Sequence, residues 1–580
     1  MTNCVWRLRE MPEEARTKAG IISDALGIPP LVAGLMAQRG IRDETSAETF
    51  LRADLVDLED PNLLDDMDKA VSRLIRAIKD REKIRVYGDY DVDGITSICV
   101  LMDVLTGLGA RVDYYIPDRV DEGYGMNHEA MRSAARDGVS LLVTVDCGIT
   151  AFSEVELARS LGIDVIITDH HEPHGGLPPA VAVINPKRND EGTCPFRDLA
   201  GVGVAYKLAC ALLMTVKGTP HVFNPPDHLL DLVALGTIAD VSPLTGENRI
   251  YAKQGLVKMN RTENLGLESL IEVCRLADRR ITAGTVGFVI APRLNAAGRI
   301  RDASLCVELL LTDSPEKAMD IAKFLDDVNS KRQDLEQQIF EEASSMVETC
   351  NGQAVDSVLV LANEGWHPGV IGIVASRLVE EFNRPTILIS LDGEEGKGSG
   401  RSIPEFDLYK ALCECGDTLL RFGGHKYAAG VLVSRRSIDE FRQGINEVGR
   451  SVLREEDFLP KINVDQELTL DEIDLEVAKG ISMLAPFGVA NPTPIFLSTG
   501  VTLKDYRGVG QGGKHLKLKL CQGDAVHDGI GFDLGHLASQ LYSHNIESID
   551  LIYTIEVNEW NGTIQPQLNV KGLRMTENRA

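Results

Sequence analysis

Short apolar runs alternate with helix-like segments from about residue 61 to residue 240, and this is the clearest pattern in the chain. The runs KIRVYG, RVDYYIP, SLLVTVD, DVIITD and AVAVINP have the length and β-branched content of buried strands. Segments such as ITSICVLMDVLTGLG and AFSEVELARSLG lie between them and have the length of helices. Strands that alternate with helices in this way predict βαβ units on a parallel sheet.

A long helical pattern follows the last of these units. Apolar residues recur at helical spacing from Ile321 to Met346, and Asp313 or Ser314 can cap the helix with Pro315 at its first position. A continuous helix of this length would extend about 57 Å at 1.5 Å per residue. The pattern therefore predicts a rod that connects two domains.

The remaining sequence completes the expected organisation. A second α/β pattern follows the rod, and the last part consists of short strands with Gly and Asn turns, which predict a small barrel. The first residues look helical and carry no recognisable chemistry. The predicted fold class is α/β, with a doubly wound parallel-sheet catalytic domain. The expected domains are an N-terminal helical segment at 1–60, the catalytic domain at 61–312, the connecting helix at 313–352, the second α/β domain at 353–455 and the β-barrel at 456–580.

Composition describes an ordinary globular protein of 580 residues, with 44% hydrophobic and 25% charged residues. No apolar run reaches the ~20 residues that span a bilayer, and the N-terminus lacks the apolar region of a secretory signal. We therefore expect a cytoplasmic protein without a membrane partner. The eleven cysteines include no CxxC pair, which argues against a disulfide framework and a structural zinc site.

The formal net charge of −27 speaks against a nucleic-acid partner, because phosphate binding normally draws on clustered Lys and Arg. Divalent metals in an acidic pocket, together with a local basic groove, can nevertheless bind phosphate on an acidic protein. The charge alone leaves both interpretations open.

Acidic residues follow the predicted strands. The first strand is followed by Asp89, Asp91 and Asp93, later strands by Asp146 and by the Asp169-His170-His171 triplet, and a further apolar run by Asp240. In an open parallel sheet, ligands bind beyond the carboxyl ends of the strands. Carboxylates packed at one edge need cations to stay ionised, and oxygen ligands with one or two imidazoles suit Mn²⁺ or Mg²⁺.

Two such ions could clamp the attacking and leaving oxygens of a phosphoryl displacement. The alternative for any single Asp after a strand is a helix N-cap or a turn residue. For Asp89 the sequence leaves these two interpretations equally open.

The ordered motifs YGDYDVDG, VTVDCG, TDHH and LGTIADVSPL resemble the DHH phosphoesterase superfamily. Within it, the chain resembles the RecJ family of single-strand-specific exonucleases, through APRLNAAGR, GWHPGVIGIVASRL, GSGRS and GGHKYAAG. The resemblance covers roughly residues 50–575. It implies a DHH-type catalytic domain, a DHH-associated domain after the rod and a C-terminal OB-like barrel.

The resemblance also implies a set of site residues. The metal ligands would be Asp91, Asp93, Asp146, His170 and Asp240, with Asp89 as a further candidate. The catalytic residues would be Asp146, His170 and His171, with His171 facing the scissile phosphate. Many relatives carry His at the position of Tyr87, so one metal site here would use Asp89, water or a different geometry.

Nucleic-acid contacts are expected from the basic and glycine-rich motifs, although each motif alone is an ordinary Gly turn. The expected residues are Arg293, Arg299, Ser399, Arg401, Gly424, His425 and Lys426. A buried structural arginine is the alternative for Arg293 and Arg299. Tyr506, Phe532 and Trp560 either stack on bases or pack in the barrel core.

The implied function is that of a metal-dependent 5′-to-3′ exonuclease that hydrolyses single-stranded DNA to mononucleotides in DNA repair and recombination. It would use two Mn²⁺ or Mg²⁺ ions, with single-stranded DNA as its partner and repair or replication proteins as further partners. The cleft between the two α/β domains should be too narrow for a duplex.

Three alternatives remain at this point: a phosphodiesterase for short oligoribonucleotides or cyclic dinucleotides, a non-catalytic replication scaffold, and a manganese-dependent inorganic pyrophosphatase. The segment GVGQGGKH fits GxxxxGK but lies between β segments, so we expect no ATP site.

Overall fold

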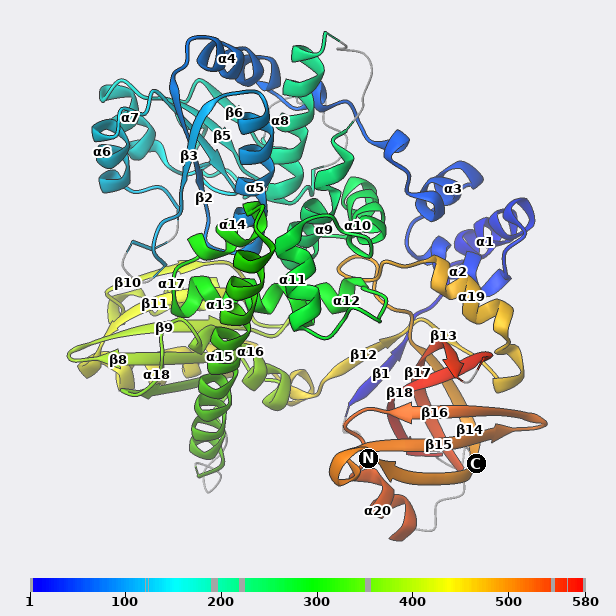
Figure 1. The fold of residues 1–580 in the computed structure, drawn as a ribbon. Helices are drawn as coiled ribbons and strands as arrows, with labels where there is room; N and C mark the ends of the chain where they lie inside the picture. The colour runs from blue at the N-terminus through cyan, green and yellow to red at the C-terminus, as the bar shows by residue number, and fades with distance from the viewer. Residues whose placement is uncertain are drawn as a thin grey trace. The chain divides into compact units, whose positions relative to one another are not determined.

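The computed structural model describes residues 4–119, 122–123, 125–188, 197–218, 225–349, 356–543, 548–560 and 562–576. The chain divides into two compact units (Figure 1). One unit comprises residues 58–243 and 247–458, and the other comprises residues 1–57, 244–246 and 459–580. The limits that the sequence suggests for individual domains stay predictions.

The first unit contains the predicted parallel sheet. Its strands lie in the order β3-β2-β4-β5-β6 and all pair in parallel. They are β2 (Lys83–Gly88), β3 (Arg111–Tyr115), β4 (Leu141–Val145), β5 (Asp164–Thr168) and β6 (Ala182–Ile184). The chain winds in one direction from β2 to β3 and in the other from β4 onwards. The switch point of the sheet, where such folds bind ligands, therefore lies between β2 and β4.

Helices cover both faces of this sheet (Figure 1). On one face, α6 (His128–Arg136) and α7 (Phe152–Ser160) enclose a core with side chains such as Tyr87, Leu142 and Ile167. The other helices are α4 (Met67–Lys79), α5 (Val92–Gly107), α8 (Gly201–Val216) and α9 (Leu230–Ala239), which pack against one another on the opposite face. Helices α5 and α8 are apolar along most of their length because both are buried.

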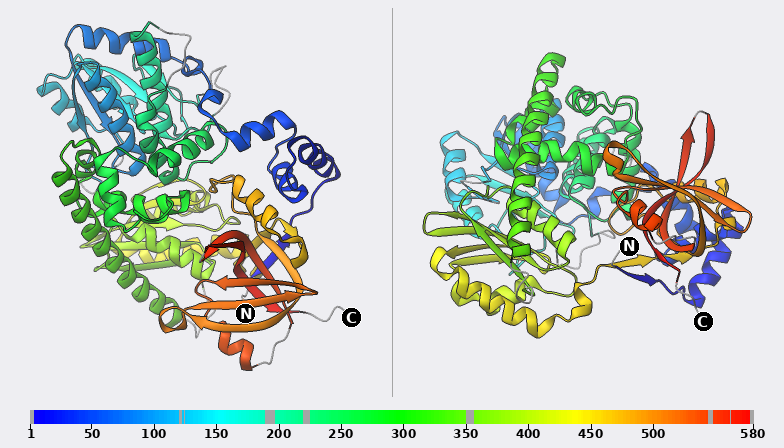
Figure 2. Two further views of the ribbon diagram at one scale, coloured as in Figure 1. Left: turned by 45° about the vertical axis from the view of Figure 1, so that its right-hand side comes forward. Right: turned by 90° about the horizontal axis from the view of Figure 1, so that it is seen from below.

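Further helices lead from the sheet to the long helix. They are α10 (Gly246–Met259), α11 (Leu265–Val273), α12 (Ala283–Thr285), a π-helical turn (Val286–Ile290), α13 (Ala291–Ile300) and α14 (Ser304–Leu311). The long helix is confirmed as α15 (Pro315–Thr349), a continuous helix of 35 residues that begins at the predicted proline. It packs against α11, α13 and α14 and, further along, against α16 (Ile371–Phe382) (Figure 2).

A second, mixed sheet follows α15 in the same unit. Its order is β10-β11-β9-β8-β7, and only β7 and β8 pair in parallel. The strands are β7 (Leu359–Asn363), β8 (Thr386–Asp392), β9 (Glu395–Arg401), β10 (Arg421–Gly424) and β11 (Ala428–Ser434), with α17 (Leu408–Glu414) and α18 (Ile438–Val452). The GSGR residues are part of β9, so this motif is a strand and not an isolated Gly turn.

The other unit is built around the predicted C-terminal barrel. Five strands pair in the order β14-β15-β16-β18-β17, and pairing between β14 and β17 closes the barrel. They are β14 (Phe496–Val509), β15 (His515–Gln522), β16 (Ala525–Gly531), β17 (Ser548–Trp560) and β18 (Thr563–Met575). This unit also contains β12 (Lys461–Val464), β13 (Gln466–Glu467), α19 (Leu475–Met483) and α20 (Leu537–Ser543).

The N-terminal residues are part of this unit and are not only helical. Strand β1 (Val5–Leu8) pairs in parallel with β12. Three helices follow: α1 (Glu13–Leu26), α2 (Pro30–Gln38) and α3 (Glu44–Arg52). Ile22, Leu35 and Met36 from these helices lie in one core with barrel residues such as Phe496 and Leu516. Among the described residues of both units, no helix has the length and apolar character needed to cross a lipid bilayer.

Candidate active site

The first motif lies on the turn between β2 and α5. Asp91 is the N-cap of α5, and its Oδ1 accepts hydrogen bonds from the backbone N–H groups of Asp93 (3.0 Å) and Gly94 (3.1 Å). At Gly94 a Cβ would lie 2.5 Å from the carbonyl oxygen of Asp89, so only glycine fits this turn. Asp91 thus satisfies the N-cap interpretation with one oxygen and leaves Oδ2 outside these two bonds.

Asp93 is held from the opposite side by α8. Its carboxylate accepts from the backbone N–H groups of Gly201 (2.7 Å) and Val202 (2.8 Å) at the first turn of that helix. A helix N-terminus favours a negative charge at this place. The side chain is therefore fixed in the buried interior at the end of β2.

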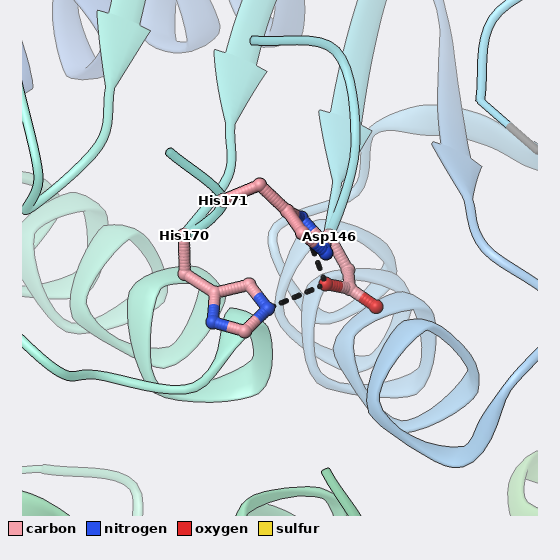
Figure 3. A group of neighbouring side chains, drawn as sticks. All are labelled: Asp146, His170 and His171. Carbon is pink, nitrogen blue, oxygen red and sulfur yellow. Dashed lines mark ion pairs between the residues drawn. The ribbon is translucent and has the colours of Figure 1, made fainter. Parts of the chain in front are cut away.

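Asp146 and His170 meet at the ends of β4 and β5 (Figure 3). Asp146 has a left-handed backbone, with φ of 59°, which turns the chain sharply after the strand. His170 Nε2 lies 3.1 Å from Asp146 Oδ1 and 3.8 Å from Asp93 Oδ2. His171 Nδ1 lies 3.9 Å from the same oxygen of Asp146.

Asp240 reaches this place from a helix. The apolar run before it is α9, so this residue is a helix C-cap and does not follow a strand. Its Oδ2 accepts from the Ser242 hydroxyl and lies 4.0 Å from His170 Nδ1. Its carboxylate is therefore fixed beside the strand ends by neighbours on both sides.

The predicted metal ligands thus come together. In the described part of the chain, three groups bring ligand atoms within 4.8 Å of one another. They are Asp146 with His170 and His171, Asp93 with His170 and Asp240, and Asp89 with Asp91 and Asp146. Tyr87 is in none of these groups.

The donor set fits divalent cations. Asp89 Oδ1 and His170 Nε2 are buried, and neither atom has a hydrogen-bond partner among the described residues. Burial and the neighbouring carboxylates raise the pKa of Asp93 and Asp146 well above the ordinary range of Asp. Burial and the nearby His171 lower the pKa of His170 to about 3, so its ring stays neutral and can act as a ligand. Closely spaced carboxylates with a neutral imidazole suit Mn²⁺ or Mg²⁺.

Asp169, which the sequence prediction passed over as a site residue, holds the two histidines. Its buried carboxylate accepts from the backbone N–H groups of Ile149 (2.9 Å), His170 (2.7 Å) and His171 (3.1 Å). His171 Nδ1 also lies 2.7 Å from Asp169 Oδ1. Burial lowers the pKa of His171, but the contact with Asp169 and the nearby carboxylates outweigh it and raise this pKa overall. The His171 ring is therefore oriented and favours its cationic form.

Three arginines gather beside the carboxylates. Arg299 donates to the carbonyl oxygen of Gly369 (3.2 Å), and Arg401 donates to Ser399 Oγ (3.2 Å) and to the Gly400 carbonyl (2.8 Å). Burial and repulsion from Arg119, Arg332 and Arg401 lower the pKa of Arg299 to about 10. Burial and Arg119 likewise lower the pKa of Arg401. Cations that repel one another in this way form a site for an anion.

Arg119 is the residue of this group that sequence reasoning missed. It follows β3, the neighbour of β2 in the sheet, and its guanidinium carbon lies 4.7 Å from the centre of the Tyr90 ring. It follows a predicted strand just as the aspartates do, and this position was the signal that could have identified it.

The other expected nucleic-acid residues lie in different surroundings. Arg293 pairs with Asp326 of α15 (2.8 Å) and donates to the Val289 carbonyl (2.6 Å), as the structural alternative predicts. His425 lines a cavity of about 490 Å³ together with His171 and Lys187. Lys426 lies over the ring of Tyr427, and Gly424 ends β10 with φ of 145°.

A groove of about 730 Å³ runs between α13, α15 and α16. Phe288 of the π-helical turn lines it and is 87% exposed. Arg299, Arg332 and Arg377 contribute positive charge, and the latter two pair with Glu336. Asn295 lines the groove, and its Oδ1 accepts from the backbone N–H of Val92 in the first motif, so this side chain connects the groove lining to that motif.

In the barrel unit, the aromatic candidates differ from one another. Phe532 is half exposed and lies edge-on to His515, whereas Tyr506 packs against the core. The side chain of Trp560 lies outside the described residues. The GVGQGGKH segment connects β14 to β15, not a strand to a long helix.

Family models match three parts of the chain. Residues 83–237 match the DHH family, N-terminal domain, residues 355–450 match the DHHA1 domain, and residues 464–572 match the RecJ OB domain. The parallel sheet with its carboxylate–histidine centre is therefore that of a DHH-type phosphoesterase.

Relatives that match nearly the whole chain identify the family within this class. The single-stranded-DNA-specific exonuclease RecJ of Bacillus subtilis is 42% identical over 575 residues, which are 99% of this chain and 71% of that protein. The Escherichia coli protein of the same name is 36% identical over 586 residues, 98% of each chain. The crystal structure of RecJ in complex with Mn²⁺ from Thermus thermophilus superposes with a TM-score of 0.83 at 31% identity, covering 99% of this chain and 80% of that one. The chain belongs to the RecJ family, and the family resemblance and the fold class expected from the sequence are confirmed.

Proposed function

We propose that this protein is a metal-dependent exonuclease that hydrolyses the phosphodiester bonds of single-stranded DNA from the 5′ end and releases mononucleotides in DNA repair and recombination. Its relatives carry the name of single-stranded-DNA-specific exonucleases, and one was crystallised with Mn²⁺ and also with Mg²⁺. The observation that carries the proposal is the carboxylate–histidine cluster beside the arginine group. Single-stranded DNA is the proposed partner, together with repair or replication proteins, and the cytoplasm is the proposed compartment.

Two divalent ions, Mn²⁺ or Mg²⁺, would be held by Asp91, Asp93, Asp146, His170 and Asp240, with Asp89 completing one of the groups. Bound there, the ions supply positive charge at the phosphate and lower the pKa of a coordinated water. Two backbone N–H groups hold Asp93, and Asp146 is buried, so these ligand positions are fixed before substrate arrives.

His171 would act on the scissile phosphate. Its raised pKa favours the protonated ring, which can donate a hydrogen bond to a non-bridging oxygen as negative charge develops there. Asp169 holds the ring through Nδ1 and so fixes its orientation.

The arginine group would bind the phosphate at the end of the strand. Arg299, Arg401 and Arg119 supply charge, and Ser399 lies against Arg401. A terminal phosphate has more charge than an internal one, so a cationic site beside the cleavage centre selects an end over the interior of a strand. His425, Lys426 and Gly424 are proposed as further contacts, from their place at the β10–β11 turn near the cavity with His171.

The groove between α13, α15 and α16 would receive the following nucleotides. Its arginines suit the backbone of one strand, and Phe288 offers an exposed ring for stacking on a base. We further propose that the cleft admits one strand and is too narrow for a duplex. Stronger digestion of blunt duplex than of single strands would contradict this selectivity.

The test uses single-stranded DNA with Mn²⁺, in versions blocked at the 5′ or the 3′ end, and the variant Asp146→Ala. We expect mononucleotide release that requires an open 5′ end, and a loss of at least about 100-fold in the variant, since even supporting residues of metal sites cost 10–100-fold. Asp68→Ala, an exposed carboxylate on α4, is the matched control and should keep full activity.

Cleavage that requires an open 3′ end would overturn the polarity. Turnover of dinucleotides or pyrophosphate without cleavage of the polymer would overturn the proposed substrate. Full activity of Asp146→Ala would overturn the assignment of the centre.

A further inference from the structure

Glu122 holds together the turn that carries Arg119. One carboxylate oxygen, Oε1, accepts from the backbone N–H of Asp118 (2.9 Å). The other, Oε2, accepts from the Tyr115 hydroxyl (2.8 Å) and from Asn127 Nδ2 (2.7 Å). The backbone N–H groups of Glu122 and Gly123 also donate to the Asp118 carbonyl, at 2.9 and 3.0 Å. Asp118, which precedes Arg119, is therefore held through both its N–H and its carbonyl by Glu122 and Gly123.

The donors to Glu122 are themselves anchored to the sheet and to a helix. Tyr115 ends β3, and its ring stacks on Tyr87 of β2, with ring centres 5.4 Å apart. Tyr87 is 1% exposed, and its hydroxyl donates to the Gly125 carbonyl (2.9 Å). Asn127 is the N-cap of α6, because its Oδ1 accepts from the Ala130 N–H (2.8 Å). Glu122 thus connects the Arg119 turn to two strands and one helix.

This network also answers the question that Tyr87 raises. The Tyr87 hydroxyl donates to the Gly125 carbonyl, and the Tyr87 ring stacks on Tyr115. The Tyr115 hydroxyl in turn donates to Glu122. Tyr87 therefore contributes to the site through packing.

A glutamate so near an anion site needs an explanation, because its charge opposes that of a phosphate. Both carboxylate oxygens of Glu122 accept hydrogen bonds from its neighbours, and among the described contacts neither pairs with the Arg119 guanidinium. The Arg119 guanidinium instead lies over the Tyr90 ring, and its positive charge acts to lower the pKa of Asp89, Arg299 and Arg401. Arginine has many rotamers, and a fixed backbone reduces the entropy that it loses when it binds.

We propose that Glu122 is a positioning residue, which fixes the turn so that Arg119 joins Arg299 and Arg401 in binding the phosphate at the end of the strand. The inference rests on the proposed function, since it assigns Glu122 a role in terminal-phosphate recognition. It predicts that substitutions of Glu122 and of Arg119 impair the same step, the binding of the terminal phosphate.

The experiment measures kcat/KM for one oligonucleotide with a 5′-phosphate and with a 5′-hydroxyl, at saturating Mn²⁺. We expect the wild type to prefer the phosphate, and Glu122→Ala and Arg119→Ala each to reduce that preference about tenfold, the size of a lost charge-assisted hydrogen bond. The double variant should lose no more than either single one, because coupled residues are not additive. For both single variants the loss should appear in KM for the 5′-phosphate substrate.

Glu129→Ala is the matched control, because this exposed glutamate on α6 pairs only with Arg132 and Arg136 of the same helix in the described contacts. It should keep the wild-type preference. Tyr115→Phe is the milder variant should Glu122→Ala fail to fold. It removes one of the three donors to the Glu122 carboxylate and leaves the other two, so it should reduce the preference by a smaller factor, about threefold.

Additive effects in the double variant, or equal losses on both substrates, would overturn the positioning role. A wild type without preference for the 5′-phosphate would overturn it as well. If the wild type cleaves neither substrate, the proposed function fails, and Glu122 is then judged by binding alone. Anisotropy with the two labelled oligonucleotides in EDTA should show a 5′-phosphate advantage that Glu122→Ala removes, and a retained advantage would overturn the inference.

Discussion

Asp89 is the residue whose role was most open from the sequence. In the structure it is 4% exposed, groups with Asp91 and Asp146, and has one carboxylate oxygen without a hydrogen-bond partner among the described residues. Burial and the adjacent Asp91 raise its pKa to about 8. A simple turn residue at a surface would show none of these features, so the ligand interpretation is the stronger one.

This pKa gives a prediction with a definite sign. The unfolded pKa of Asp is about 3.9. The folded protein therefore binds the extra proton between about pH 4 and pH 8, and the metal-free protein loses stability as pH rises through that range. We expect Asp89→Asn to raise the melting temperature in EDTA at pH 8 by about 2 °C or more, and to change it little at pH 4.

Scanning calorimetry at both pH values, with EDTA and with Mn²⁺, makes this measurement. Mn²⁺ should stabilise the wild type more than Asp89→Asn, because the variant lacks one carboxylate of the group. Asp68→Asn is the exposed control. A variant that melts below the wild type in EDTA at pH 8 would contradict the prediction.

Residues at strand ends were predictable, because the order of strands fixes which side chains share an edge. Arg119 also follows a predicted strand, but its charge has the opposite sign to that of the aspartates, and only folding brings it to Arg299 and Arg401. Glu122 was not predicted, because no motif marks it and its contacts with Tyr115 and Asn127 form only in the folded chain. The different roles of Arg293 and Arg299 could have been predicted from the sequence. Six residues apart on one helix, they point about 120° away from each other, so both cannot face the same phosphate.

Among the elements, the π-helical turn before α13 has a clear physical origin. Pro292 has no N–H to donate to the carbonyl of residue 288, and the turn widens there, with the Ala291 N–H bonded to the Val286 carbonyl. Phe288 is carried outward to the groove, where it is 87% exposed. Such an exposed ring beside arginines is typical of a base-stacking position.

We predict that Phe288→Ala weakens binding of long single strands about five- to tenfold, near the lower range of a lost base–aromatic stack. Cleavage of a dinucleotide, which lacks the following nucleotides that the groove would receive, should stay unchanged. KM values for oligonucleotides of increasing length make the comparison. Phe324→Ala, an exposed ring on α15 outside the groove lining, is the control, and an equal effect of both variants would contradict a stacking role.

Helix α9 shows why the hydrophobic pattern of a sequence cannot identify every helix. It is buried nearly all round, so it has no polar face and no helical period. At Gly236 a Cβ would lie 2.3 Å from Thr96 Oγ1, which shows how closely α9 packs on α5. A short apolar run of this kind cannot be told from a buried strand, whereas the amphipathic α15 could be predicted with its first residue.

On the scale of the whole molecule, the N-terminal residues are joined to the C-terminal barrel. No local pattern indicates this, because α1 and α2 contain apolar residues whose partners lie more than 400 positions away. The net charge was an equally poor guide, since a protein of −27 concentrates three arginines beside one acidic centre.

The shared core leads to a prediction for Leu35→Ala, which removes a fully buried side chain of α2. It should destabilise the barrel unit by about 2–5 kcal/mol, as for other buried leucines. Hydrogen exchange should speed up in β14–β18 and stay unchanged in the parallel sheet β2–β6 of the other unit. Ile21→Ala, at a 56% exposed position of α1, is the control. Unchanged exchange in the barrel strands would contradict a common core.

The union of β1 with β12 also sets an order of events during synthesis. Arg9 pairs with Asp465, 456 residues further along the chain. At a synthesis rate of about 5–20 residues per second, roughly 20–90 s pass between the synthesis of β1 and that of its partner β12. The two α/β sheets can fold within that interval, while Ile22, Leu35 and Met36 still lack the barrel strands that bury them. The nascent chain thus presents an apolar N-terminal segment to chaperones until synthesis has passed the barrel.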